Sequence, residues 1–376
     1  IIFLLVLIYV KSFSQNSSIE WAGKIGGNYN DGLLDLHIDS SGNLLTTGYF
    51  QVNADLDFGT GGYTLTGVSG FDAFVAKYDV AGNYLWVKSF QGIASGTNEQ
   101  GSGIDVDNLG NVYVVGTYNS FGGLDLDPSA ATVSVPNYGS TAGTSDIFVA
   151  RLDTNGNYSW GTSFTNSNNI DDAWGISVDD NYNILLSGHF NATQIDLNPL
   201  APAGDQLVTG NTLGSNDIFI TKLNAAGTDL LGSLRIGGTG DDGVNVRPNY
   251  ASPENSETTR RNYGDDARSE IILDAGGNPI LASVTQSIDF PVTTGAFQTT
   301  PGQASTTRFQ DGVVMKLTPD LNNMLFASYL GGNGDDAAFV VATHPQNGNI
   351  YVAGATNSTD LPGNKTGVRF PTFQGN

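Results

Sequence analysis

Five acidic residues recur at one position of an internal repeat, and carboxylates are the side chains of this sequence best placed to do chemistry. Each acid lies eight residues before the residue that closes a short apolar segment. If the repeats surround an axis, the carboxylates form an acidic ring at the mouth of a channel, which would attract Ca²⁺ or a cationic group. Alternatively, each acid caps its own glycine-rich connection by accepting backbone amides. The five acids are Asp31, Glu99, Asp171, Asp266 and Asp336.

Half of the eight arginines gather in one short stretch. Arg247, Arg260 and Arg261 lie within residues 237–267, and Arg268 follows directly. The formal net charge of the chain is −22. In such a chain the cluster would either bind an anionic glycan or a partner's carboxylates, or neutralise acids nearby. The sequence leaves both interpretations open.

Polar residues in the first segments of two repeats offer an acid–base site. Asp35, His37, Arg268 and Glu270 share one face, at positions where other repeats mostly place Gly, Ala or Ser. Near a channel they would act as the general acid and base of a glycan-active enzyme. Salt bridging explains the same residues equally well.

Composition and motifs argue against other chemistry. The chain has no cysteine, which excludes disulfides, thiolate zinc sites and a cysteine nucleophile. No HExxH, GxSxG or Walker motif occurs. Asp153, Asn155 and Asn157 have the spacing of a calcium loop, but Gly156 and Phe164 at its fourth and twelfth positions favour a turn. With 15 basic against 37 acidic residues, a nucleic-acid partner is not expected.

Recurring phrases define the elements that would position these residues. Each repeat reads as four short strands: a segment that ends in Asp, a glycine–asparagine phrase, a phrase like DIFVARL, and a phrase that often begins with Trp. The second and third phrases are almost continuously apolar, which is typical of strands covered on both faces, and helical periodicity is absent. This pattern predicts an all-β propeller of four-stranded antiparallel blades. The last three phrases start at 42, 110, 182, 277 and 348; at 72, 146, 217 and 311; and at Trp21, Trp86, Trp160, Gly232 and Phe326.

The connections between these strands are of two kinds. Asp-x-x-Gly turns join strands one and two and strands three and four, because Asp accepts turn amides and Gly takes the left-handed conformation. The long connections leave from the opposite face, where we expect them either to carry binding or to cover strand ends. About five repeat units are visible. The ring is expected to be incomplete in this sequence, because the fifth unit has two strands and the chain opens on a fourth strand. The long connections are 49–71, 117–145, 189–216, 237–267 and 284–310.

The chain resembles the secreted seven-bladed β-propeller (SBBP) repeat proteins. The resemblance rests on GGNGDDAAFVVATHPQNGNIYVAGATNSTDLPG (331–363), DGVVMKLTPDLNNMLFASYLGG (311–332) and the DLDFG and LDLDP segments at 55–59 and 124–128. It implies a propeller exported to the outer surface, in relatives often by type IX secretion, and it supplies no catalytic residues. The long insertion in the fourth unit and the unfinished fifth unit depart from the family pattern.

The first residues predict a targeting segment. Residues 1–10 are uninterruptedly apolar, too short to span a bilayer, and are followed by small polar residues. We interpret 1–15 as the remnant of a signal peptide, with a buried first strand as the alternative. The propeller then occupies 16–376. Its units lie near 21–90, 91–164, 165–236, 237–330 and 331–376.

These observations favour an exported, non-catalytic binding or adhesion module of a secreted or cell-surface protein, whose partner is an extracellular glycan or protein surface. One alternative is a glycan-active enzyme with its site at the channel mouth. The other is an architectural spacer in a giant surface protein. No cofactor is expected, and Ca²⁺ is the one metal that the acidic ring would bind. No transmembrane segment is expected in the mature chain.

Overall fold

The computed structural model is all β, with no helix among the residues that it describes. The chain divides into two compact units, residues 1–168 and 169–376. Strands within a blade are called first to fourth in chain order. The structure describes residues 21–59, 62–93, 96–119, 123–129, 131–135, 145–164, 171–191, 194–198, 207–209, 216–245, 269–302 and 310–363.

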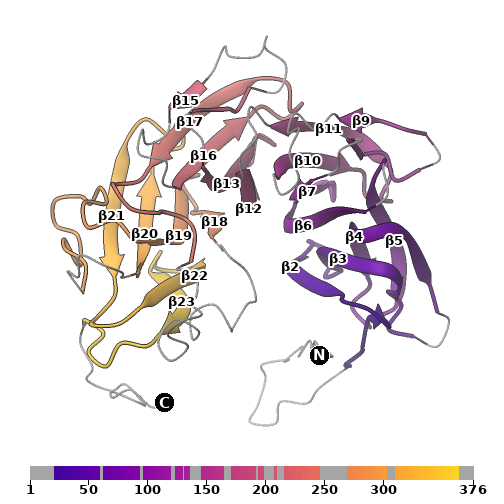
Figure 1. The fold of residues 1–376 in the computed structure, drawn as a ribbon, viewed down its shortest axis with the longest axis horizontal. Coiled ribbons are helices and arrows are strands. Elements are labelled where there is room, and N and C mark those ends of the chain that lie inside the picture. Colours follow the sequence, from indigo (N-terminus) through magenta and orange to yellow (C-terminus); the bar gives the residue numbers. More distant parts are fainter. Residues whose placement is uncertain are drawn as a thin grey trace. The chain divides into compact units, whose positions relative to one another are not determined.

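The N-terminal unit contains two four-stranded antiparallel blades (Figure 1). A short parallel pairing of Gly70 and Phe71 with Thr97 and Asn98 joins the two blades. Blade 1 consists of β2 (Gly32–Ile38), β3 (Leu44–Asp55), β4 (Thr64–Tyr78) and β5 (Tyr84–Gly92). Blade 2 consists of β6 (Thr97–Val106), β7 (Val112–Tyr118), β10 (Asp146–Leu152) and β11 (Tyr158–Phe164). The short strands are β1 (Gly26–Gly27), β8 (Leu124–Asp125) and β9 (Ser134–Val135).

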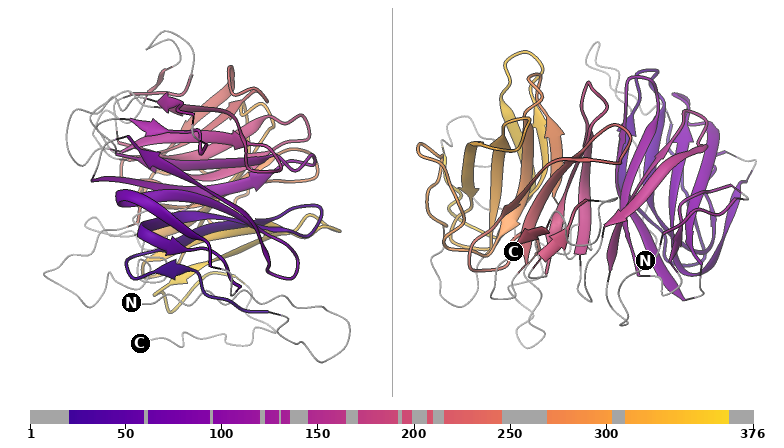
Figure 2. Two further views of the ribbon diagram at one scale, coloured as in Figure 1. Left: turned by 90° about the vertical axis from the view of Figure 1, so that its right-hand side faces the viewer. Right: turned by 90° about the horizontal axis from the view of Figure 1, so that it is seen from above.

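The C-terminal unit contains two further blades and a pair of strands from a fifth (Figure 2). The predicted propeller of four-stranded blades is therefore confirmed. Blade 3 consists of β12 (Asp171–Val178), β13 (Ile184–Phe190), β16 (Asp217–Leu223) and β17 (Leu230–Ile236). Blade 4 consists of β18 (Glu270–Leu273), β19 (Pro279–Thr285), β20 (Asp311–Leu317) and β21 (Met324–Leu330). Blade 5 contributes β22 (Asp336–Thr343) and β23 (Ile350–Thr356), and β14 (Gln194–Asp196) pairs with β15 (Leu207–Thr209).

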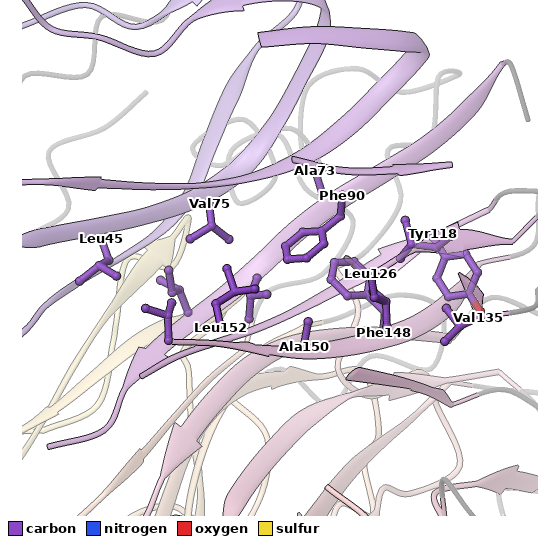
Figure 3. Close-up of a cluster of buried hydrophobic side chains, with 14 residues drawn as sticks. Leu45, Ala73, Val75, Phe90, Tyr118, Leu126, Val135, Phe148, Ala150 and Leu152 are labelled. Carbon is purple, nitrogen blue, oxygen red and sulfur yellow. The ribbon is translucent and has the colours of Figure 1, made fainter. Parts of the chain in front are cut away.

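Four of the middle strands of the blades are buried along their whole length. Every residue of β7, β13, β16 and β19 is buried, as their continuously apolar sequences predict. In the N-terminal unit, Phe90 of blade 1 and Phe148 of blade 2 pack with their ring centroids 5.7 Å apart. Figure 3 shows this cluster filling the space between the two blades. Burying each such side chain contributes about 1.5–3 kcal/mol, so blade-to-blade packing is a main source of stability.

Tight turns join the first strand to the second and the third to the fourth. At the first of them, Asp39 Oδ1 accepts the amides of Ser41 and Asn43, and Gly42 has a φ of 82°. A buried lysine of the third strand, Lys77, contacts the same Asp39 at 2.9 Å. Because the third strand runs toward this turn, each complete blade repeats the ion pair between a third-strand cation and a turn Asp. The other pairs are Arg151–Asp107, Lys222–Asp179 and Lys316–Asp274.

The connections between second and third strands fold back along the blades. β8 of the connection in blade 2 pairs with β5, the outer strand of blade 1. Buried leucines of these connections, such as Leu56 and Leu126, anchor them in the core clusters. Edge strands present unpaired amides and carbonyls, so these connections cover exposed edges. We call the described parts, residues 53–66, 123–135, 194–209 and 286–302 without their gaps, the edge-covering connections.

Blade 4 differs from the sequence-based prediction at its first strand. The sequence places a long insertion before this strand, within 237–267, but Asp242 already forms a β-bridge with Thr285. The ladder with β19 resumes at Glu270, which pairs with Ala282. In blade 5 the same stretch of ladder contains a β-bulge between Ala338 and Val340. The insertion therefore interrupts the first strand at its bulge position, because a bulged residue makes no ladder bond that an insertion would break.

Candidate functional site

Acids at the start of first strands accept backbone amides from the glycine-rich connections before them. Asp336 Oδ2, for example, accepts the amide of Gly332 at 2.7 Å and the hydroxyl of Ser358 at 2.6 Å. This is the geometry of the capping interpretation. We call these side chains the first-strand acids. They are Asp31 on Gly27, Glu99 on Gly92, Asp242 on Gly238 and Asp336 on Gly332.

A second series of acids lies beside them, at the start of third strands. The carbonyl of Gln310 accepts the amide of Asp336 at 2.7 Å, so the next residue, Asp311, lies beside that first-strand acid. The carbonyl of Asn216 accepts the amide of Asp242 at 2.8 Å in the same way. We call Asp72, Asp217 and Asp311 the third-strand acids. Each described junction between two blades of one unit thus holds two acids: Asp72 with Glu99, Asp217 with Asp242, and Asp311 with Asp336.

Burial sets the electrostatics of these junctions. Asp72, Glu99, Asp242 and Asp311 are at most 1% exposed. Burial raises the pKa of Glu99 to about 8 and that of Asp72 to about 6. It also raises the pKa values of Asp242 and Asp311 to about 7. A neighbouring carboxylate adds to the effect: Asp72 on Glu99, and Asp336 on Asp311.

Glycine at the end of the fourth strand makes room for these pairs. A Cβ on Gly237 would clash with oxygens of both Asp217 and Asp242. A Cβ on Gly331 would clash with Asp311 in the same way. The glycine–glycine phrases at 237–238 and 331–332 therefore accommodate carboxylates and donate amides to them.

The third-strand acids were missed by sequence reasoning, although the signal is present. Each opens the third-strand phrase, and the next first-strand acid follows 25 or 27 residues later. In blade 4 the acid that makes the first-strand contacts is Asp242. Asp266, Arg247, Arg260, Arg261 and Arg268 lie outside the described residues, so their predicted roles stay predictions.

The acids proposed for a ring fall into both units. Asp31 and Glu99 belong to the N-terminal unit, while Asp171 and Asp336 belong to the other. Asp171 is buried at the start of β12, opposite Phe190 in the ladder. Across the described ranges, no three His, Asp or Glu side chains converge closely enough to hold a metal ion. Calcium binding by the ring stays a prediction.

The acid–base residues contact the backbone or side chains of the neighbouring blade. Asp35 Oδ2 accepts the amide of Ile104 at 2.8 Å, and Glu270 Oε2 accepts the amide of Val341 at 2.6 Å. His37 Nδ1 lies 3.0 Å from Asp105 Oδ1 on the next blade. Asp35 directly follows the β-bulge of its first strand. Both carboxylates bond to the backbone of the next blade, so they join one blade to the next. Asp35 and His37 lie in one unit and Glu270 in the other.

Exposed aromatic side chains are found on the edge-covering connections. Tyr63 is 41% exposed and stacks on Tyr84, with centroids 4.9 Å apart and an interplanar angle of 20°. Phe297 is 57% exposed on the connection of blade 4. That connection is fixed to the outer strand by the bond from the Tyr329 amide to the Gln298 carbonyl at 3.2 Å. The connections are thus anchored and still present apolar surface to solvent.

No family model matches the chain. It is 32% identical, over 116 residues, to an uncharacterized WD repeat-containing protein of Acanthamoeba polyphaga mimivirus. The chain is a β-propeller repeat protein. The match covers 30% of this propeller and 8% of the viral protein, so the propeller spans a small part of that relative's length.

Two solved structures also align with the propeller. One is a protein of unknown function from Bacteroides caccae, 10% identical, with a TM-score of 0.27 over 80% of this chain and 82% of that chain. The other is quinohemoprotein alcohol dehydrogenase from Comamonas testosteroni, 9% identical, with a TM-score of 0.31 over 86% and 52%. None of the described residues forms a helix of the length and apolar character needed to cross a bilayer.

Proposed function

We propose that this propeller is an exported, non-catalytic module that binds an extracellular glycan or protein surface through its edge-covering connections. The observation that carries the proposal is the exposure of Tyr63 and Phe297 on anchored connections. Aromatic side chains supply large contact areas at binding surfaces, and anchoring reduces the ordering cost of binding. On the first of these connections Asp57 accepts the Gly59 amide through Oδ1, and its Oδ2 offers an acceptor for a sugar hydroxyl.

The contacts of the acid–base residues support a non-catalytic role. Asp35 and Glu270 each accept an amide of the neighbouring blade, and that hydrogen bond occupies one oxygen of each carboxylate. A general acid or base needs to reach a substrate proton. We therefore assign both side chains to blade packing.

Export and the relation to SBBP proteins belong to the same proposal. The motifs that carry the resemblance have a structural purpose in blades 4 and 5. Asp360, in the segment 331–363, accepts the amide of Asn333 in blade 5. Asp289 accepts the amide of Thr239 in blade 4, so the same hydrogen bond holds the glycine-rich connection in both blades. Antibody labelling of intact cells of the source organism tests export: surface labelling supports it, and labelling only after lysis contradicts it.

An array of glycans together with a panel of extracellular-matrix proteins tests binding. The full chain is expected to be retained on at least one class of surface, without release of sugar products. Product release that Asp35→Asn or Glu270→Gln abolishes would favour the glycan-active enzyme. Failure to bind any surface would favour the architectural spacer.

A further inference from the structure

Two blade junctions bury a pair of carboxyl groups that form no ion pair with another described residue. Among the described residues, no Lys, Arg or His forms an ion pair with Asp72 or Glu99, or with Asp311 or Asp336. The third junction differs, because Arg235 Nη2 lies 2.8 Å from Asp217 Oδ1. Two ionised carboxylates buried side by side repel each other and lose their hydration, so without a cation each pair would need another source of neutralisation.

Some oxygens in these pairs accept no hydrogen bond within the part of the chain that the structure describes. Asp72 Oδ1 and Glu99 Oε1 are buried and accept no hydrogen bond from the described residues, and the same holds for Asp311 Oδ1. A buried acceptor without a donor costs about 1–3 kcal/mol. A proton on either carboxyl would remove one of the two charges from the junction and the cost of burying it.

We propose that the pairs Asp72–Glu99 and Asp311–Asp336 each hold one proton at neutral pH, so that these blade junctions are proton-binding sites whose deprotonation loosens the contact between blades.

The surroundings of both pairs favour the protonated form. Asp335 and Asp360 face the Asp311–Asp336 pair, and so does the phenol of Tyr329. None of these three groups carries a positive charge that would favour the ionised form of the pair. For the Asp72–Glu99 pair, the Asp72 carboxylate raises the pKa of Glu99. The donors to this pair among the described residues are neutral: Thr97 and Gly92 donate to Glu99, and the Val68 amide donates to Asp72. The raised pKa values of Glu99 and Asp311 agree with protons held by the folded state.

The sign of the pH dependence follows from these raised pKa values. In the unfolded chain the same carboxyls ionise near pH 4, whereas the folded pairs keep a proton up to about pH 7 to 8. The stabilisation is therefore complete below about pH 4, falls progressively above it, and is fully lost once pH exceeds the folded pKa of about 7 to 8. Between about pH 4 and the folded pKa, unfolding of each junction releases one proton, which contributes a rise of about tenfold per pH unit to the unfolding constant of its unit.

Denaturant unfolding of the full chain between pH 5.5 and 9.5 tests the proposal. Glu99→Gln keeps a neutral donor at the junction. We expect this variant to lose one proton's worth of the pH dependence of the free energy of unfolding of the N-terminal unit. At pH 9 it should be at least as stable as the parent. Asp79→Asn removes an exposed turn acid and is the matched control, which should keep the parent slope. A parent profile that is flat from pH 6 to 9, or a Glu99→Gln profile with the parent slope, would overturn the proposal.

Infrared spectroscopy of the parent keeps the test independent of how well a variant folds. A carbonyl-stretch band of protonated carboxyl groups should persist at pH 7 and disappear by about pH 9.5. The absence of that band from the folded parent at pH 7 would also overturn the proposal.

Discussion

Neighbouring groups shift the pKa values of different aspartates of this propeller in opposite directions. Asp39, Asp179 and Asp274 lie at tight turns, where amides and a lysine lower their pKa values against the effect of burial. Asp311 lies at a blade junction, where burial and a second carboxylate raise its pKa. Turn aspartates therefore stabilise the folded state above pH 4 and lose that effect as pH falls, whereas junction acids stabilise it at low pH.

The buried ion pair of blade 1 gives the first prediction. Lys77→Met should lower the free energy of unfolding by about 3 kcal/mol, because Asp39 would stay buried without its cation. Lys316→Met is the matched control. Its pair with Asp274 is more exposed, so its loss should cost at most about 1 kcal/mol. Chemical denaturation at pH 7 measures both, and equal losses would contradict the account.

Blade 3 offers a stabilising change at its first turn. Tyr182 has a φ of 66° and takes the position that Gly42, Gly110 and Gly277 hold in the first-to-second turns of blades 1, 2 and 4. Left-handed backbone costs a non-glycine residue about 1–2 kcal/mol, so Tyr182→Gly should raise the free energy of unfolding by about 1 kcal/mol. The converse change Gly42→Ala in blade 1 should lower it. A destabilised Tyr182→Gly protein would show that contacts of the Tyr182 side chain outweigh the strain.

At the scale of elements, strands and tight turns follow directly from the sequence. Continuous apolar runs predict β7 and β16, and the Asp-x-x-Gly pattern predicts the turns, because both signals are local. The position of the insertion in blade 4 is not local. The GDD segments at 240–242 and 264–266 fit the repeat equally well, and only the bridge from Asp242 to Thr285 distinguishes them.

The edge-covering connections could not be predicted for a similar reason. Their sequences have no hydrophobic periodicity, and their course depends on the outer strand against which each of them packs. The third-strand acids are visible as a repeated Asp, but their burial and pairing depend on how two blades pack. Sequence therefore indicates the positions of the acids without their partners.

Glycine at the end of a fourth strand gives a prediction for the blade junction. Gly331→Ala should lower the free energy of unfolding by about 1–3 kcal/mol, because its Cβ would displace the Asp311 carboxylate. Asp311→Ala in the same chain should recover part of the loss, which a double-mutant cycle measures. Additive losses in the double variant would contradict a direct contact between the two positions.

At the scale of the whole molecule, calcium distinguishes the acidic ring from amide capping. If the ring binds Ca²⁺, millimolar calcium raises the Tm, and a ligand at 100 times its Kd adds about 2.7 kcal/mol. The double change of Asp171 and Asp266 to Asn should then stabilise the calcium-free protein and abolish the calcium response. Thermal melts with calcium and with chelator decide the question. A destabilised double variant, with no calcium shift in the parent, would end the cation-ring hypothesis.

The most direct test of the binding function compares two parts of the surface in one assay. On the glycan and matrix-protein surfaces, the double variant Tyr63→Ala, Phe297→Ala should lose at least tenfold in apparent affinity, because it removes the exposed aromatics of the edge-covering connections. Leu109→Ala removes an equally exposed apolar side chain, 61% accessible at a tight turn, and should bind like the parent. Unchanged binding by the aromatic double variant, or no binding by the parent to any surface, would contradict the account.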